Sequence, residues 1–131
     1  MTIYVIGGIN QDIVATSDNH LRPGETLTGT GLAYYPGGKG ANQAIAAARA
    51  GSPVTMIGCT GDDAFGAGLR SYLAESAVDI SRVSVSKDSP TGTALIIVAK
   101  GENSIMVVLG ANKEVMPEFV NDINLESDDV V

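Results

Sequence analysis

The sequence predicts an α/β fold, in which helices cover a layer of parallel strands and a small β element projects from that layer. Short apolar runs alternate with helical segments early in the chain, which is the pattern of a parallel sheet. Residues 12–35 and 93–109 break this alternation with half-exposed strand patterns, so we assign them to the separate β element. A length of 131 residues fits one domain or part of one.

Two apolar runs form the expected parallel layer. Ile3–Ile6 ends at a pair of glycines, and Val54–Ile57 is equally short and continuous, as is typical of strands buried on both faces. Residues 41–50 contain six alanines and predict a thin helix, which Gly51 is placed to end. Val83–Val85 is a candidate third strand.

A second helix is expected after Asp63, which is a suitable N-cap. Apolar side chains follow at helical spacing on one face, at Phe65, Leu69, Tyr72 and Leu73. Pro117 predicts the start of a last helix, and Ser127–Val131 resembles the start of another buried strand. We therefore expect an α/β domain that is truncated at its C-terminal side.

The projecting β element combines two parts of the chain. Thr93–Ala99 and Ile105–Leu109 flank the polar loop Lys100–Asn103, which is the pattern of a hairpin. Asp12–Ser17 and Thr26–Tyr35 favour shorter, half-exposed strands, the latter with threonine and tyrosine in loose alternation.

Charge and composition exclude several classes of partner. Eight basic against 15 acidic residues give a net charge of −7, which disfavours nucleic acid and anionic membranes. The absence of tryptophan leaves little for base stacking. No stretch approaches the roughly 18 apolar residues of a membrane span, and the N-terminus lacks the basic region of a signal peptide. The single cysteine, Cys59, fits a reducing cytoplasm and is expected to pack as a small apolar residue.

Common nucleotide and metal motifs are not found. The chain lacks the third glycine of a dinucleotide fingerprint after its first strand, and Gly40 stands where a P-loop has Ser or Thr. One histidine and one cysteine far apart give no metal-ligand spacing, and His20 is interpreted as a surface residue. Asp62 and Asp63 suggest an acid–base or metal pair, but helix capping is the simpler interpretation.

Two polar clusters are candidate ligand-binding residues. Asn10 and Asp12 point to the same side if the chain stays extended, where an amide and a carboxylate can hold a polyol. An Asx turn is the alternative, and these two residues alone favour it. In Pro36–Asn42, three glycines surround Lys39 before a helix, so backbone amides, the helix dipole and an ammonium can meet a ligand. The alternative is a glycine-rich turn with a solvated lysine.

Five segments, taken in order and spacing, resemble the N-terminal part of the ribokinase (PfkB-type) carbohydrate kinase family. The similarity runs along essentially all 131 residues. The segment Gly37–Ala44, with its glycines, lysine and asparagine, resembles the N-terminal signature of the family. The other segments are Gly8–Asp12, Pro23–Thr26, Cys59–Asp63 and Thr91–Ile96.

The resemblance implies a layered α/β body with a small β-sheet lid over a sugar. The lid would take residues about 11–35 and 93–110, within one ribokinase-like domain of which residues 1–131 are the N-terminal part. Family members commonly dimerise through these lids. By resemblance, the sugar-binding residues are Asn10, Asp12, Gly38, Lys39, Asn42, Ala94 and Ile96, the last two from the lid hairpin.

The resemblance also implies ATP, Mg²⁺ and a monovalent cation as cofactors of the complete enzyme. In the family, the catalytic aspartate, the ATP pocket and the cation sites belong to the C-terminal half, which this chain lacks. We therefore expect no catalytic residue, no metal site and no bound cofactor in these 131 residues. Because phosphoryl transfer depends on positioning and charge stabilisation, we expect this chain alone to be inactive.

Two functions are compatible with the sequence and with the family resemblance. The first is the sugar-binding part of a cytoplasmic, ATP-dependent kinase that converts a pentose, with D-ribose as the leading candidate, into its 5-phosphate. The second is a non-catalytic fragment that self-associates through its β lid, because a truncated sheet leaves an unpaired edge and exposed apolar surface. The sequence does not separate ribose from deoxyribose, another sugar or a nucleoside.

Overall fold

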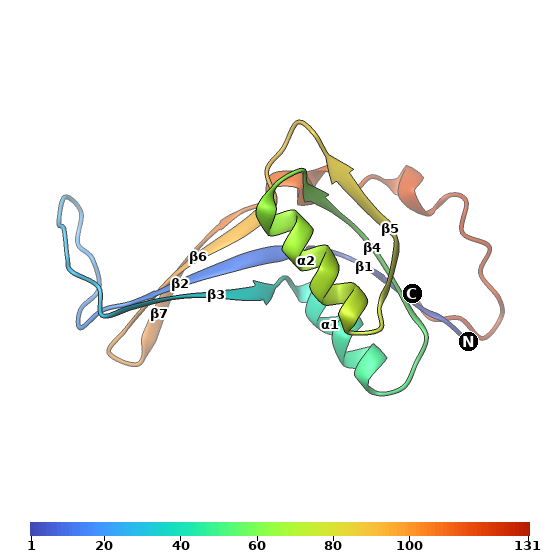
Figure 1. The fold of residues 1–131 in the computed structure, drawn as a ribbon, viewed down its shortest axis with the longest axis horizontal. Coiled ribbons are helices and arrows are strands. Elements are labelled where there is room, and N and C mark those ends of the chain that lie inside the picture. The colour runs from blue at the N-terminus through green and yellow to red at the C-terminus, as the bar shows by residue number, and fades with distance from the viewer.

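A three-stranded parallel sheet forms the body of the structure, a computed structural model that describes all of residues 1–131. Its strands are β1 (Ile3–Ile6), β4 (Val54–Gly61) and β5 (Asp79–Ser86), in the order β1-β4-β5. Helix α1 (Lys39–Arg49) contacts β1 and β4, and α2 (Ala64–Glu75) contacts β4 and β5 (Figure 1). The alternating strand and helix patterns of the sequence thus form the predicted parallel layer.

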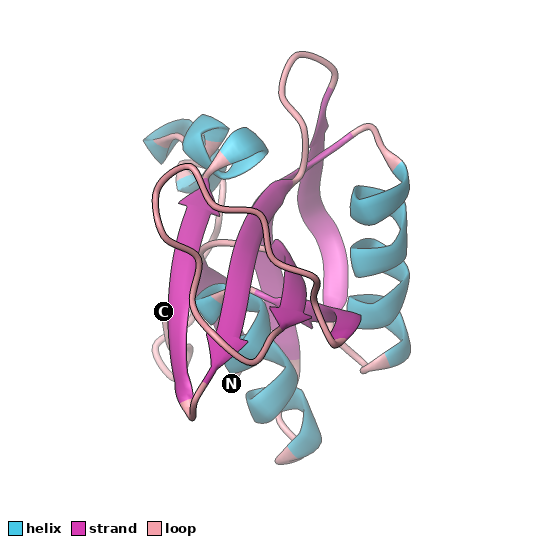
Figure 2. Cartoon of the chain, turned by 90° about the vertical axis from the view of Figure 1, so that its left-hand side faces the viewer, coloured by secondary structure: helices cyan, strands magenta, loops and turns pink.

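A second sheet projects from the body, and we call it the projecting sheet. Its strands are β3 (Gly31–Gly37), β2 (Asn10–Thr16), β6 (Gly92–Ala99) and β7 (Glu102–Val108), in that order. β2 and β6 run parallel, whereas β3 and β7 are antiparallel to their neighbours. Figure 1 shows this sheet extending to the left, away from the helices, and Figure 2 views the molecule from that free end. The two segments that break the strand–helix alternation therefore pair with each other.

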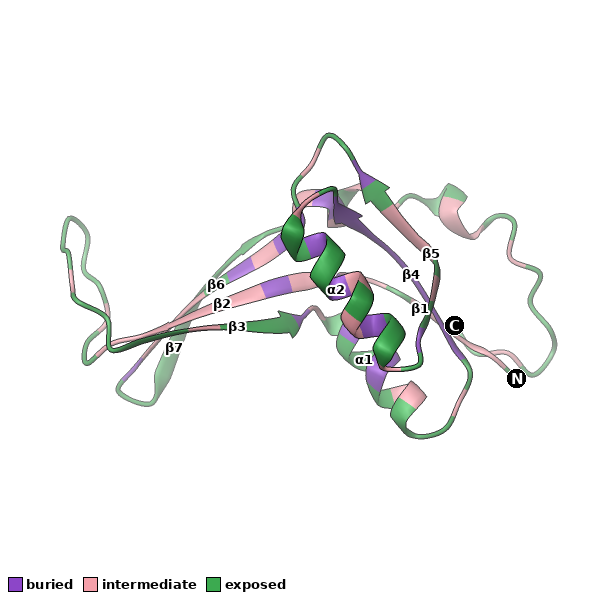
Figure 3. Cartoon of the chain, viewed as in Figure 1, coloured by how far each residue is buried: buried purple, intermediate pink, exposed green.

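The core lies where the helices pack on the parallel sheet. Every residue of β4 is buried, as the purple ribbon of that strand shows (Figure 3). Ile9, Met56 and Leu73 belong to the core cluster, and each fully buried side chain of this size contributes roughly 1.5–3 kcal/mol. Ala41 and Ala44 face this cluster from α1, so the alanine-rich helix can approach the sheet closely.

Several boundaries differ from the sequence-based expectations. β2 already begins at Asn10, and β3 begins only at Gly31, because cross-strand pairing decides where these strands end. Two short 3₁₀ helices follow β7: η1 (Gly110–Glu114) and η2 (Pro117–Val120). Pro117 thus starts a single turn, and Val130 forms only an isolated parallel bridge with Ile3. None of the helices combines the length and apolar character needed to cross a bilayer.

Candidate functional site

Four of the predicted site residues share one face of the projecting sheet. Asn10 and Asp12 are two residues apart on β2, and Asp12 is paired with Ala94 of β6. Ile96 follows two residues further along β6. Because paired residues and residues two apart in a strand point the same way, the amide, the carboxylate and the two apolar side chains lie on the same face.

Asp12 presents a carboxylate without a partner. The carboxylate lies against the Cα atom of Gly37, where any side chain on that residue would occupy the same space. Partial burial raises the pKa of Asp12 above its ordinary value, and no hydrogen bond offsets this effect. Its lone pairs are therefore free to accept hydrogen bonds from the hydroxyl groups of a ligand.

Gly38 brings the N-terminus of α1 against the start of β2. Its φ of 96° lies in the left-handed region, and a side chain there would collide with the Gly8 carbonyl oxygen and crowd the Asn10 nitrogen. The Ala41 N–H also donates to the Gly8 carbonyl, at 3.2 Å. Packing inside the protein thus requires a glycine at position 38, a reason that sequence spacing does not reveal.

Lys39 and Asn42 lie in the first turn of α1 with exposed side chains. Neither of the two ion pairs in the structure involves Lys39. The side chains of Lys39 and Asn42 thus form no hydrogen bond or ion pair, and they lie at a helix N-terminus that packs against Gly8 and the start of β2. The structure therefore brings Asn10, Asp12, Ala94 and Ile96 together, with Gly38 beside them. The side chains of Lys39 and Asn42 form no hydrogen bond or ion pair with the pair on β2.

Asn112 is a site residue that the sequence interpretation missed. From η1 it accepts a hydrogen bond from the Ile9 N–H at 2.9 Å, and its Nδ2 donates to the Asn10 Oδ1 at 2.7 Å. These partners are more than 100 residues away in sequence. A polar residue in a short Gly-Ala-Asn segment after a predicted hairpin was the only available signal.

Asp63 links α2 to the start of β6. Its carboxylate accepts from the Gly66 N–H at 2.8 Å, the Thr91 N–H at 2.8 Å and the Thr91 hydroxyl at 2.6 Å. Burial acts to raise the pKa of Asp63, but these hydrogen bonds and the nearby Arg70 outweigh it and hold the pKa below its usual value. The geometry agrees with the capping interpretation of this carboxylate, and the neighbouring Asp62 is exposed.

The remaining polar candidates give no second site. His20 is half-buried in a hollow on the loop after β2, beside Arg22, Glu25 and Lys100. Cys59 is buried within β4. No group of three or more histidine, cysteine, aspartate or glutamate side chains is placed to hold a metal ion.

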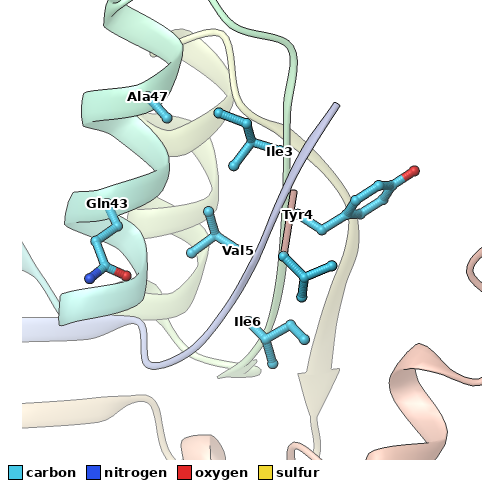
Figure 4. Close-up of a pocket in the computed structure, with 7 residues that line it drawn as sticks. Ile3, Tyr4, Val5, Ile6, Gln43 and Ala47 are labelled. Carbon is cyan, nitrogen blue, oxygen red and sulfur yellow. The ribbon is translucent and has the colours of Figure 1, made fainter. Parts of the chain in front are cut away.

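A separate apolar hollow of about 400 Å³ lies between β1 and α1 (Figure 4). Ile3 and Val5 point toward the helix, whereas Tyr4 points away from it. Gln43 is the only polar side chain in its lining. A hollow with so few hydrogen-bonding groups is a packing surface rather than a site for a polyol.

The chain resembles known proteins over nearly its whole length. Residues 2–131 match the model of the pfkB family carbohydrate kinases. Ribokinase of Bacillus subtilis (strain 168) is 44% identical over 117 residues, which are 89% of this chain and 40% of that protein.

Solved ribokinase structures also resemble the chain in fold and in sequence. A ribokinase from Cryptococcus neoformans in complex with ADP has a TM-score of 0.75 and 42% identity, over 84% of this chain and 35% of that one. Arabidopsis thaliana ribokinase complexed with ribose and ATP has a TM-score of 0.78 and 34% identity, over 84% and 36% of the two chains. The two-sheet α/β fold is therefore shared with solved ribokinases, and the chain spans 40% or less of the length of these relatives.

Proposed function

The chain belongs to the pfkB family of carbohydrate kinases, and we propose that residues 1–131 form the sugar-binding part of an ATP-dependent kinase that phosphorylates a pentose. D-ribose is the leading substrate, and ribose 5-phosphate is the product. The relative from Bacillus subtilis is a ribokinase, and the one from Arabidopsis thaliana was solved with ribose and ATP. These relatives support a sugar and ATP as the substrates of the whole protein.

One observation carries the sugar assignment: the unpartnered carboxylate of Asp12 lies beside the amide of Asn10 on one face of a strand. A half-buried carboxylate whose pKa is raised by burial, with no bond inside the chain to offset it, is typical of a functional residue. Asp12 accepts hydroxyl protons, and Asn10 both donates and accepts. A vicinal diol of a sugar meets both requirements.

The other proposed sugar contacts come from two neighbouring elements. Gly38, Lys39 and Asn42 lie at the N-terminus of α1, beside the start of β2. Ala94, the strand partner of Asp12, is buried, and Ile96, two residues further along β6, adds a half-buried apolar side chain on the same face. In this proposal the projecting sheet, residues about 11–35 and 93–110, acts as a lid that excludes water from the sugar and so strengthens its hydrogen bonds.

ATP supplies the phosphoryl group in this reaction, and the residues described here hold and orient the sugar. They provide no cluster of three acidic, histidine or cysteine side chains. Following the family resemblance, we assign none of them to Mg²⁺, to a monovalent cation or to ATP. On the family resemblance, we propose that the general base and the nucleotide site belong to the part of the ribokinase relatives that residues 1–131 do not cover, and that the 131-residue chain alone is inactive.

A kinase assay tests this function. A longer protein that contains residues 1–131 together with a segment equivalent to the remaining length of the ribokinase relatives should form ribose 5-phosphate from D-ribose and ATP. The 131-residue chain should form none under the same conditions. Failure of the longer protein with every sugar and nucleoside tried would contradict the proposal.

Exposed apolar side chains favour a second property, self-association through the projecting sheet. Leu95 of β6, Tyr34 of β3 and Met106 of β7 lie on the face opposite Asp12 and are 43%, 55% and 65% exposed. An apolar sheet face of this kind marks an interaction surface. Sedimentation should show a dimer or larger species that Leu95→Glu disperses and Met116→Glu, a change at an exposed methionine outside the projecting sheet, leaves intact. A monodisperse monomer of the unaltered chain would contradict self-association.

A further inference from the structure

We propose that Asn112 is a positioning residue, which holds the side chain of Asn10 in the orientation that turns its amide nitrogen toward the sugar site. The inference rests on the proposed function, because it says which atom of Asn10 meets a sugar hydroxyl. Asn112 lies in η1, 102 residues from Asn10 in sequence, and is half-buried against the start of β2.

The main chain of Ile9 determines how the Asn112 amide is turned. The Ile9 N–H can only donate, and it does so to Oδ1 of Asn112 at 2.9 Å. The Ile9 carbonyl can only accept, and it does so from Nδ2 of Asn112 at 3.2 Å. These two bonds leave no freedom to exchange the oxygen and nitrogen of the Asn112 side chain.

The orientation of Asn10 follows from that of Asn112. The second proton of the Asn112 Nδ2 is directed to Asn10, with a donor–acceptor distance of 2.7 Å. Only an oxygen can accept there, so Oδ1 of Asn10 faces Asn112. The amide nitrogen of Asn10 therefore lies on the other side, where no group of the chain accepts from it.

The surrounding structure makes room for this pair and anchors it. Gly92 is the partner of Asn10 in the β2–β6 register, and a side chain at position 92 would collide with Nδ2 of Asn112 and Oδ1 of Asn10. η1 is fixed by the fully buried Ala111, whose N–H donates to the Pro90 carbonyl at 2.8 Å. Asn112 is thus tied both to β2 and to the chain that enters β6.

The fixed orientation gives the site one donor and one acceptor. Nδ2 of Asn10 donates to a hydroxyl oxygen, and the carboxylate of Asp12, two residues along the strand, accepts a hydroxyl proton. A reversed Asn10 would present two acceptors side by side. The hydroxyl oxygens of the ligand would then find no donor on this strand, and the lost bond would weaken binding.

Side-chain NMR of the ligand-free 131-residue protein tests the positioning directly. In the unaltered protein, the ¹⁵N–¹H NOE of the Asn10 side-chain amide should match that of the ordered backbone. Asn112→Ala should lower it toward the value of the exposed Asn42 side chain. Asn103→Ala, which removes an exposed asparagine from β7, should leave it unchanged. An Asn10 amide that is mobile in the unaltered protein, or that stays ordered in Asn112→Ala, would overturn the proposal.

A second variant covers the case in which Asn112→Ala does not fold. Asn112→Asp keeps the shape and can still accept from Ile9, but it cannot donate to Asn10. The Asn10 amide should then reverse, and the affinity for D-ribose should fall about five- to tenfold, as for the loss of one hydrogen bond. The same substitution in an Asn10→Ala background should change the affinity less than about twofold, because coupling between neighbours is lost.

The two readouts separate the two proposals. The Asn10 amide could be ordered in the unaltered protein and become mobile in Asn112→Ala while the protein binds no ribose. That result would support the positioning role and count against the sugar function of this chain. Ribose binding that is equally tight in the unaltered protein and in Asn112→Asp would overturn the positioning role and leave the sugar function intact.

Discussion

The body and the projecting sheet are held together by different means. In the body, every residue of β4 is buried between its neighbours and the helices. In the projecting sheet, every residue of β7 is exposed, and the strands are joined mainly by their backbone pairing (Figure 3). Burial thus fixes the body, whereas the projecting sheet depends on register and on a few polar contacts at its base.

The candidate site lies where these two regions meet. Asn10 and Asp12 are at the base of β2, next to the packed N-terminus of α1. Two polar links, Asn112 to β2 and Asp63 to Thr91, tie the projecting sheet to the body at the same level. These side-chain hydrogen bonds hold the base of the projecting sheet, and the exposed strands beyond them are the part that would move in the proposed lid.

A matched pair of leucines tests the contrast most strongly. Leu73 of α2 is 1% exposed, whereas Leu95 of β6 is 43% exposed. Leu73→Ala should lower the free energy of unfolding by about 2–5 kcal/mol, because it leaves a cavity in the core. Leu95→Ala should change it by less than about 1 kcal/mol when the protein is dilute enough for the proposed assembly to dissociate. Chemical denaturation measures both, and equal losses would show that the projecting sheet has a core of its own.

Two glycines with similar backbone conformations allow the cost of backbone strain to be measured apart from the cost of a steric collision at the base of the site. Gly38 has a φ of 96° and faces the backbone of Gly8 and Asn10, whereas Gly51 has a φ of 93° and open space around it. Gly51→Ala should cost about 1 kcal/mol or more through strain alone. Gly38→Ala should cost clearly more and should also weaken sugar binding. Thermal unfolding compares them, and equal costs would mean that the contact with β2 is unimportant.

The adjacent residues Asp62 and Asp63 should give the smallest difference in stability. Asp63→Asn should destabilise the fold by about 1 kcal/mol through its lost hydrogen bonds, and Asp62→Asn, at an exposed position, should have almost no effect. Because the pKa of Asp63 is lowered on folding, its contribution is complete above the unfolded pKa and is lost as the pH falls through the folded one. The free energy of unfolding should therefore depend less on pH, between neutral and acidic conditions, in Asp63→Asn than in the unaltered protein. An equal pH dependence in the two proteins would contradict the stabilising role of the Asp63 carboxylate.

Sequence patterns predicted the body well because its elements are governed by local rules. The apolar run at Ile3–Ile6, the alanine-rich helix and the Asp63 cap all appear in the structure close to where they were expected. The family resemblance read from five short segments is confirmed by the family match over residues 2–131. The ends of β2 and β3 were less well predicted, because pairing with distant strands decides them.

The site depended on contacts that no local pattern encodes. Asn10 and Asp12 alone favoured an Asx turn, whereas both lie within β2 in the structure. Gly38 reads as a residue for ligand approach, yet its neighbours within the chain also require it. Asn112 escaped notice because its partners at Ile9 and Asn10 become neighbours only when the two ends of the domain meet. Predictions of side-chain pairs across such separations need the fold first.

Calorimetric titration of the 131-residue protein with D-ribose, with Asp12→Asn alongside, tests the central claim most directly. The unaltered protein should release heat on binding, and Asp12→Asn should weaken binding about tenfold or more, because a charged hydrogen-bond acceptor is replaced by a neutral one. Asp12→Asn should also be the more stable protein at neutral pH, since burial raises the pKa of Asp12 and disfavours its charge. Equal ribose affinity in the two proteins would contradict the account, because Asp12 would then not hold the sugar.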